Sequence, residues 1–276
     1  MALPDFVYIG TARAGSTWLF EALRQHPEIF VPPAKDIYFF DRYYDKGLEW
    51  YKGFFKDIGE ARIAGELSHD YYFSENAADR IKADMPGVKL ICCLREPVDK
   101  LLSGYSYNQT MNVNRTVSLD EYAQDPEIQK EFRYYEHLRM YLERFSAEQV
   151  LVVFYEDLKA DPLKYIQSIY DFLGVDLNVV PEMANETINA SRKVRVQGLA
   201  FFTYRVAQVF RGLGLANFVG RVKQSPVLNK MLYKASPREE DSMELLPADV
   251  VIQLREHHGK LAALLGKPLP ASWYEE

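Results

Sequence analysis

A glycine-rich stretch near the start of the chain, GTARAGST at residues 10–17, has the side chains and spacing of a phosphate-binding loop. Gly10 and Gly15 fit the motif G-x-x-x-x-G-K-[ST], but Ser16 occupies its lysine position and Arg13 lies inside the loop. Such a loop between a strand and a helix offers backbone N–H groups and the positive end of a helix dipole to an anion. For the two glycines alone, a tight strand-to-helix turn capped by hydroxyl residues is the alternative interpretation.

The end of a later apolar run adds a second cation. VKLICCL (88–94) is typical of a buried strand and is followed at once by Arg95. A P-loop ATPase or kinase needs a lysine on the β- and γ-phosphates and an acidic residue that holds Mg²⁺ at such a strand end. Arg13 and Arg95 in place of these groups favour an anionic ligand that is bound without a metal ion.

Apolar runs alternate with helical patterns over the first 174 residues. Because the runs are continuously apolar, they predict an α/β fold with a mostly parallel central sheet flanked by helices. We predict a single domain over residues 1–276, with a core at about 5–195 and a helical extension at about 196–276. Strands are expected at 6–10, 61–67, 88–94 and 149–155, and helices after the glycine loop up to His26, at about 76–84, from 97, at 127–145, at 156–173 and over much of 196–265.

Composition excludes several classes of protein. The chain has 276 residues, and 48% of them are hydrophobic, which argues for a globular core. Its net charge of −6 argues against nucleic-acid binding. Its only cysteines, Cys92 and Cys93, are adjacent, so neither a normal disulfide nor a metal site is expected. This usage favours a reducing compartment, the cytoplasm. No signal peptide or membrane-spanning run is expected.

One basic segment stands out from the acidic chain. Residues 192–234 contain nine Lys or Arg residues and no Asp or Glu. The aromatic and basic part at 199–234 has three interpretations: a peripheral helix packed on the core, a lid over a pocket, or a surface for peripheral membrane contact.

Several segments together resemble the sulfotransferases that use 3′-phosphoadenosine-5′-phosphosulfate (PAPS). The resemblance is to both the cytosolic and the heparan sulfate or carbohydrate branches, and it suggests a bacterial-type member. It implies a P-loop-like fold, PAPS as sulfuryl donor, and in-line transfer without a metal ion. The segments are ARAGSTW (12–18), LREPVDKLLSGYSYN (94–108), LVVFYEDLKADPLKYIQSIYDFLG (151–174), HPEIFVPPAKDIYFFDRYYDKGLEWYKGFF (26–55) and LLGKPLPASW (264–273).

The resemblance also implies roles for individual residues. Arg13 takes the position of the catalytic lysine of the family, where a guanidinium stays charged but does not donate a proton as lysine does. Arg95 and Ser103, eight residues apart, would bind the 3′-phosphate. The implied cofactor-binding set is Arg13, Ala14, Gly15, Ser16, Thr17, Trp18, Arg95, Ser103, Tyr155 beside the adenine, and Arg192, Lys193 and Arg195 in a late basic loop.

Two residues are candidates for the base that takes a proton from the acceptor. Asp36 lies where the carbohydrate branch has its catalytic glutamate, and His69 lies near the catalytic histidine of the cytosolic branch. Lys35 could assist with the sulfonate, or it could be a plain surface charge. The resemblance implies a lysine where Leu67 stands, and either Lys35 or Arg13 could replace that cation. Both base candidates also have structural interpretations, as a turn residue and as a strand-end histidine.

The expected function is transfer of a sulfuryl group from PAPS to a hydroxyl or amine of a small-molecule or carbohydrate acceptor. The alternatives are a P-loop-type nucleotide kinase or NTPase and a non-catalytic nucleotide-binding module. The residues leave the acceptor and the oligomeric state open.

Overall fold

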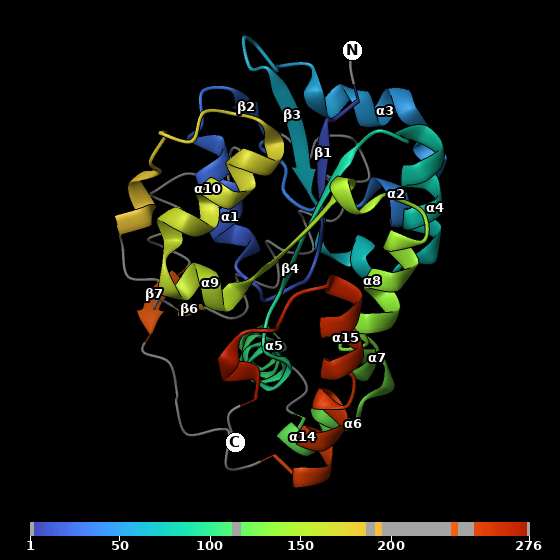
Figure 1. Cartoon of the computed structure of the whole chain (residues 1–276), viewed down its shortest axis with the longest axis vertical. Helices are drawn as coiled ribbons and strands as arrows, with labels where there is room; N and C mark the ends of the chain where they lie inside the picture. The colour runs from blue at the N-terminus through green and yellow to red at the C-terminus, as the bar shows by residue number, and fades with distance from the viewer. Residues whose placement is uncertain (1–2, 112–116, 186–190, 195–232, 237–245, 275–276) are drawn as a thin grey trace.

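The computed structural model describes residues 3–111, 117–185, 191–194, 233–236 and 246–274 (Figure 1). Its centre is a five-stranded sheet in the order β2-β3-β1-β4-β5, with every neighbouring pair parallel. The predicted α/β class with a parallel sheet is therefore confirmed. The strands are β1 (Phe6–Gly10), β2 (Ile29–Phe30), β3 (Ile63–Leu67), β4 (Lys89–Leu94) and β5 (Val150–Phe154).

Helices cover both faces of this sheet, which explains why its strands are apolar throughout. One face of β1 and β4 packs against α1 and α10, and the other packs against α4, α8 and the C-terminal segment. The helices are α1 (Ser16–Arg24), α2 (Phe39–Arg42), α3 (Leu48–Lys52), α4 (Glu75–Asp84), α5 (Pro97–Met111), α6 (Leu119–Gln124), α7 (Pro126–Lys130), α8 (Tyr134–Leu142), α9 (Tyr155–Ala160), α10 (Pro162–Leu173), α14 (Ala248–Arg255) and α15 (His258–Leu265).

Two helices expected to be continuous are each divided. The pattern at 127–145 forms α7 and α8, and Glu131 between them pairs with the buried ammonium of Lys100 at 2.8 Å. The pattern at 156–173 forms α9 and α10, because Pro162 begins a new helix whose N-cap, Asp161, accepts a hydrogen bond from the Lys164 backbone N–H at 3.0 Å. Local periodicity is similar in a broken and an unbroken helix, so the sequence pattern alone missed both breaks.

The region after residue 190 differs from the expected helical extension where it is described. A short strand, β7 (Tyr233–Ser236), pairs antiparallel with β6 (Ser191–Val194). The pairing partners lie about 40 residues apart in the chain, so local pattern did not reveal them. The helices α14 and α15 do agree with the prediction, and Figure 1 shows them in red beside α5 and α8.

The C-terminal segment contributes to the central core. Trp273 is fully buried, and its ring lies 5.9 Å from that of Tyr134 and 5.6 Å from that of Phe154. Tyr134 in turn donates a hydrogen bond to the backbone carbonyl of Arg95 at 2.9 Å. The end of the chain therefore buttresses the segment that follows β4. The division of the whole chain into one domain stays a prediction.

Candidate active site

The carboxyl ends of three neighbouring strands provide the loops of the site. β1 ends at Gly10, β3 at Leu67 and β4 at Leu94, and because these strands are parallel their following residues meet at one edge of the sheet. The backbone N–H and the hydroxyl of Thr11 both donate to the Cys93 carbonyl, at 2.9 and 3.0 Å. This contact fastens the start of the glycine loop to the end of β4.

The glycine loop leads directly into α1, as the sequence predicted. Gly15 adopts φ +81° at the N-cap of α1, and a Cβ added there would lie 2.7 Å from the Leu158 side chain. Ala14 and Ser16 are buried, whereas Thr17 is exposed. Trp18 follows in α1, with its ring edge against Tyr165 at a centroid distance of 6.0 Å. The loop therefore presents the N-terminal turn of a nine-residue helix to the edge of the sheet.

Arg13 and Ser103 lie together, although 90 residues separate them in the chain. Arg13 has φ +61°, and its Nε donates a hydrogen bond to the Ser103 hydroxyl at 3.1 Å. Its guanidinium also lies 4.9 Å from the ring centre of Tyr107, one turn further along α5. Enclosure by protein atoms and then the charge of Arg95 lower the pKa of Arg13, whose guanidinium nevertheless stays charged at neutral pH.

Arg95 is the buried cation of the site, with 5% of its surface exposed. Its Nη1 donates to the Arg13 carbonyl at 3.0 Å, its Nη2 lies 3.4 Å from the Asp99 carboxylate, and its guanidinium lies 4.6 Å from the Tyr155 ring centre. The buried Nε has no hydrogen-bond partner among the described residues. A buried donor in need of an acceptor fits the bound phosphate that the resemblance implies at this position.

Lys35 also reaches the glycine loop, from the segment that follows β2. Its Nζ donates to the Ser16 hydroxyl at 3.0 Å and to the Thr17 hydroxyl at 3.2 Å. An ammonium group therefore lies at the first turn of α1, which is the position of the helix where an anion is favoured.

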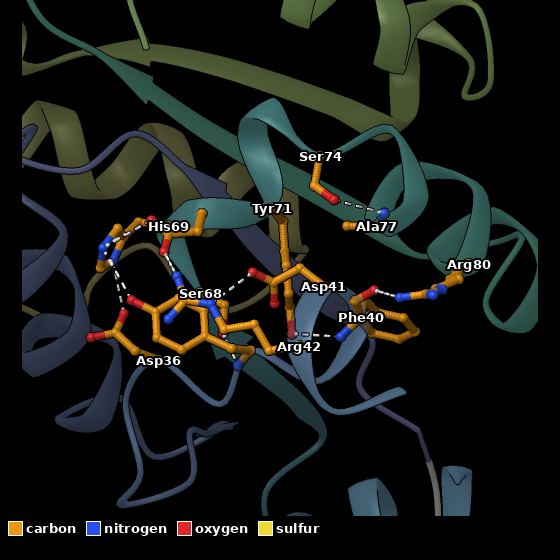
Figure 2. A network of polar contacts seen from close by, with 12 residues as sticks. Asp36, Phe40, Asp41, Arg42, Ser68, His69, Tyr71, Ser74, Ala77 and Arg80 are labelled. Carbon is orange, nitrogen blue, oxygen red and sulfur yellow. Dashed lines mark hydrogen bonds and ion pairs between the residues drawn. The ribbon is translucent and has the colours of Figure 1, made fainter. Parts of the chain in front are cut away.

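The two candidate bases, Asp36 and His69, are hydrogen-bonded to each other. The Asp36 Oδ1 lies 2.8 Å from the His69 Nδ1, and Figure 2 shows the carboxylate directed at the ring. Asp36 has φ +62°, and its backbone N–H donates to the Leu67 carbonyl at 2.8 Å. On the other side of the ring, Nε2 lies 3.1 Å from the Tyr38 hydroxyl and 3.3 Å from the Asp70 Oδ1.

The two carboxylates determine how His69 titrates. Burial by itself lowers the pKa of His69, but the charge and hydrogen bond of Asp36, with a smaller contribution from Asp70, raise it above its usual value. The Asp36 carboxylate is therefore the main influence that raises the pKa of His69.

Sequence reasoning missed a buried acid beneath this pair. Glu66 on β3 is fully buried; its Oε1 accepts hydrogen bonds from the Tyr51 and Tyr71 hydroxyls, and its Oε2 accepts one from Ser68, all at 2.9 Å. Ser68 in turn accepts from the Tyr38 backbone N–H at 3.0 Å, and Figure 2 shows Ser68 between the site and Tyr71. The available signal was a single acidic residue within the apolar run 61–67.

Glu66 has a strongly perturbed ionisation. Burial raises its pKa to about 7, although the three hydroxyl donors act in the opposite direction. The network therefore connects a group that titrates near neutrality to the backbone of the segment that carries Asp36.

The side chains of three predicted cofactor-binding residues are not among those that the structure describes. Arg192 and Lys193 lie on β6, where the backbone alone is described, and Arg195 lies outside the described residues, as does most of 199–234. Tyr155, by contrast, is placed beneath the Arg95 guanidinium at the start of α9.

Over the described ranges, the His, Cys, Asp and Glu side chains form no group of three or more that could bind a metal ion. None of the described helices combines the length and apolar character that a membrane span needs.

Comparisons with known proteins identify what the chain is similar to. The family model described as "Sulfotransferase domain" matches residues 3–207. The human heparan sulfate glucosamine 3-O-sulfotransferase 3B1 is 33% identical over 186 residues, which cover 63% of this chain and 46% of that protein. The membrane-associated sulfotransferase kil1 of Dictyostelium discoideum is 34% identical over 124 residues, 44% of this chain and 26% of that one. The chain thus spans less than half the length of these relatives.

Solved structures share the fold of this chain. A sulfotransferase from Alicyclobacillus acidocaldarius superposes with a TM-score of 0.71 at 21% identity and covers 100% of both chains. The sulfotransferase domain of the curacin biosynthetic pathway gives a TM-score of 0.55 at 15% identity, covering 98% of this chain and 100% of that one.

The coupling of His69 to Asp36 predicts the effect of removing each carboxylate. We expect the pKa of His69 to lie above its usual value in the wild type and to fall in Asp36→Asn, because the largest raising influence is lost. The fall in Asp70→Asn should be smaller. Nuclear magnetic resonance of the histidine rings during a pH titration measures both, with His69→Gln used to assign the signal. An equal fall in the two variants would contradict the assignment of Asp36 as the main partner.

The raised pKa of Glu66 predicts a pH-dependent stability. The folded protein holds this proton more tightly than the unfolded chain does, so the contribution of Glu66 to the free energy of unfolding is lost as pH rises from about 4.5 to about 7. Relative to the wild type, Glu66→Gln should therefore gain up to about 3 kcal/mol between pH 5 and pH 8. Urea unfolding at the two pH values measures this gain, and Glu143→Gln on the surface is the control. Parallel behaviour of wild type and Glu66→Gln would contradict the prediction.

Proposed function

The chain belongs to the sulfotransferase domain family, and from that premise we propose that it transfers the sulfuryl group of PAPS to an acceptor hydroxyl or amine. The observation that carries the proposal is the arrangement of the glycine loop. The loop leads into the N-terminus of α1, and its Arg13 carbonyl accepts from the buried Arg95, whose Nε lacks an acceptor within the described part of the chain. The Asp36–His69 pair follows on the neighbouring segment at the same edge of the sheet.

The residues of the site divide the chemistry among themselves. Bound PAPS would supply an activated sulfuryl group and a phosphate leaving group. Backbone N–H groups at the start of α1 and the Arg95 guanidinium would bind the two phosphate-bearing ends of the donor. The Asp36–His69 pair would take the proton of the acceptor, a contribution of about 10²–10⁴ to the rate. Positioning and electrostatic stabilisation by these groups account for the reaction without a metal ion.

The alternative of a P-loop kinase or NTPase is not favoured. The end of β4, where such enzymes need a metal-binding acid, carries Arg95, and the lysine slot of the loop carries Ser16. The alternative of a non-catalytic binding module leaves the contact between Asp36 and His69 without a purpose. The first observation supports sulfuryl transfer over phosphoryl transfer, and the second supports an enzyme over a binding module.

For the acceptor we propose a hydroxyl of a carbohydrate or of a small molecule. Matched relatives are named as glucosamine 3-O-sulfotransferases of heparan sulfate, which supports a saccharide hydroxyl. A cytoplasmic location also stays our proposal, supported by two buried cysteines that are not joined in a disulfide.

Nucleotide binding tests the proposed donor. We expect 3′-phosphoadenosine 5′-phosphate (PAP) to bind in the presence of EDTA and to stabilise the protein by about 2.7 kcal/mol at a hundredfold excess over Kd. Arg95→Met should abolish most of this gain, whereas the exposed Arg139→Met should retain it. Thermal unfolding and calorimetry provide the measurement. Binding of ATP only with Mg²⁺, and none of PAP, would refute the proposal.

Sulfate transfer from labelled PAPS to a panel of saccharide and phenol acceptors tests the base. Asp36→Asn and His69→Ala should each lower kcat/KM by about 10²–10⁴. Because the pair acts as one unit, kcat/KM of the double variant should be close to that of the less active single variant. PAP affinity should be unchanged in all three. If the two losses multiply in the double variant, the residues act independently and the proposed coupling is wrong.

A further inference from the structure

Two cations belong to or approach the glycine loop, but their side chains contact different helices. Lys35 donates to the hydroxyls of Ser16 and Thr17 in the first turn of α1. Arg13, although it belongs to the loop, extends away to Ser103 on α5. We propose that Lys35, rather than Arg13, binds the sulfuryl end of the donor, and that Arg13 serves the 3′-phosphate end together with Arg95. This inference rests on the proposed function and refines it.

The surroundings of Lys35 support its role. A helix N-terminus repels a cation, so an ammonium group there is stabilised when an anion lies between it and the backbone N–H groups. The two hydroxyls that accept from Lys35 come from consecutive residues, Ser16 and Thr17, and they fix the ammonium at the turn where that anion would lie. The buried, unsatisfied Nε of Arg95 is an independent sign of a ligand at this edge.

The surroundings of Arg13 assign it to the other end of the donor. Its guanidinium contacts Ser103 and lies over the Tyr107 ring, and both of these residues are on α5. Its carbonyl accepts from Arg95, which draws two positively charged residues together. Burial and then the charge of Arg95 lower the pKa of Arg13, so the two cations repel each other. A dianion bound by both would offset this repulsion, which describes a phosphate better than a singly charged sulfonate.

The division also fits the apolar slot at residue 67. Leu67 is buried at the position where the resemblance implies a lysine, so this position supplies no charge to the sulfonate. Lys35 compensates from a different segment, and Asp36, the next residue, is anchored by its backbone N–H to the Leu67 carbonyl. A cation for the leaving side and a carboxylate for the attacking side thus lie on consecutive residues.

This arrangement gives a balanced transfer step. The bond between sulfur and the 5′-phosphate oxygen breaks, and its electron pair stays on that oxygen. A new bond forms between sulfur and the acceptor oxygen, whose proton passes to the Asp36–His69 pair. The Lys35 ammonium neutralises the charge that develops on the leaving oxygen.

Binding of three nucleotides separates the two roles and needs no acceptor. PAPS differs from PAP by the sulfuryl group, and PAP differs from adenosine 5′-monophosphate by the 3′-phosphate. Lys35→Ala should lower the ratio of PAPS affinity to PAP affinity about tenfold and leave the ratio of PAP to the monophosphate unchanged. Arg13→Ala should do the reverse. The surface variant Lys52→Ala is the matched control and should change neither ratio.

The outcomes distinguish this inference from the function on which it rests. If calorimetry detects no PAP binding to the wild type, the proposed function fails. If the wild type binds PAP but Arg13→Ala lowers the PAPS-to-PAP ratio while Lys35→Ala does not, the function stands and the division of roles is wrong. Equal effects of the two variants on both ratios would also overturn it. Circular dichroism of each variant identifies any loss of fold.

Discussion

Burial of the Arg95 guanidinium is the constraint on which the remaining geometry of the site depends. A charge removed from water costs several kcal/mol unless acceptors and opposite charge surround it. The Asp99 carboxylate, the Arg13 carbonyl and the Tyr155 ring meet part of that need, while Tyr134 holds the Arg95 backbone. The contacts of the guanidinium come from α5, the glycine loop and α9, so one buried cation fixes three segments relative to one another, and the backbone contact adds α8.

The strand order places an opposite kind of buried group on the other side of the loop. β1 lies between β4, which ends at the buried cation Arg95, and β3, which carries the buried acid Glu66. Glu66 is surrounded by hydroxyl donors instead of a cation, so its pKa rises to about 7, and its hydrogen bonds lead through Ser68 to the segment of Asp36. In the proposed reaction, the anion would therefore bind toward β4, and the acceptor proton would be taken toward β3.

Sequence patterns predicted the parts of this arrangement that depend on local chemistry. Continuous apolar runs identified four of the five parallel strands and the loop before α1, while the two-residue β2 was too short to recognise. The resemblance brought Arg95 and Ser103 into one predicted subsite, and the structure places both against Arg13. The buried partners of Glu66 come from segments that pattern cannot align, so that network was missed.

The same limit explains why the choice between Asp36 and His69 was left open. Each residue matched a different branch of the family, and only the three-dimensional structure shows that the two side chains are hydrogen-bonded to each other. Leu67 stands where the resemblance implies a lysine, and in our proposal Lys35 supplies that positive charge from another segment, at the first turn of α1. The Arg13 side chain, in contrast, contacts Ser103 on α5. The position of a charge at the sheet edge, rather than its place in the chain, therefore determines which end of an anionic donor it can stabilise.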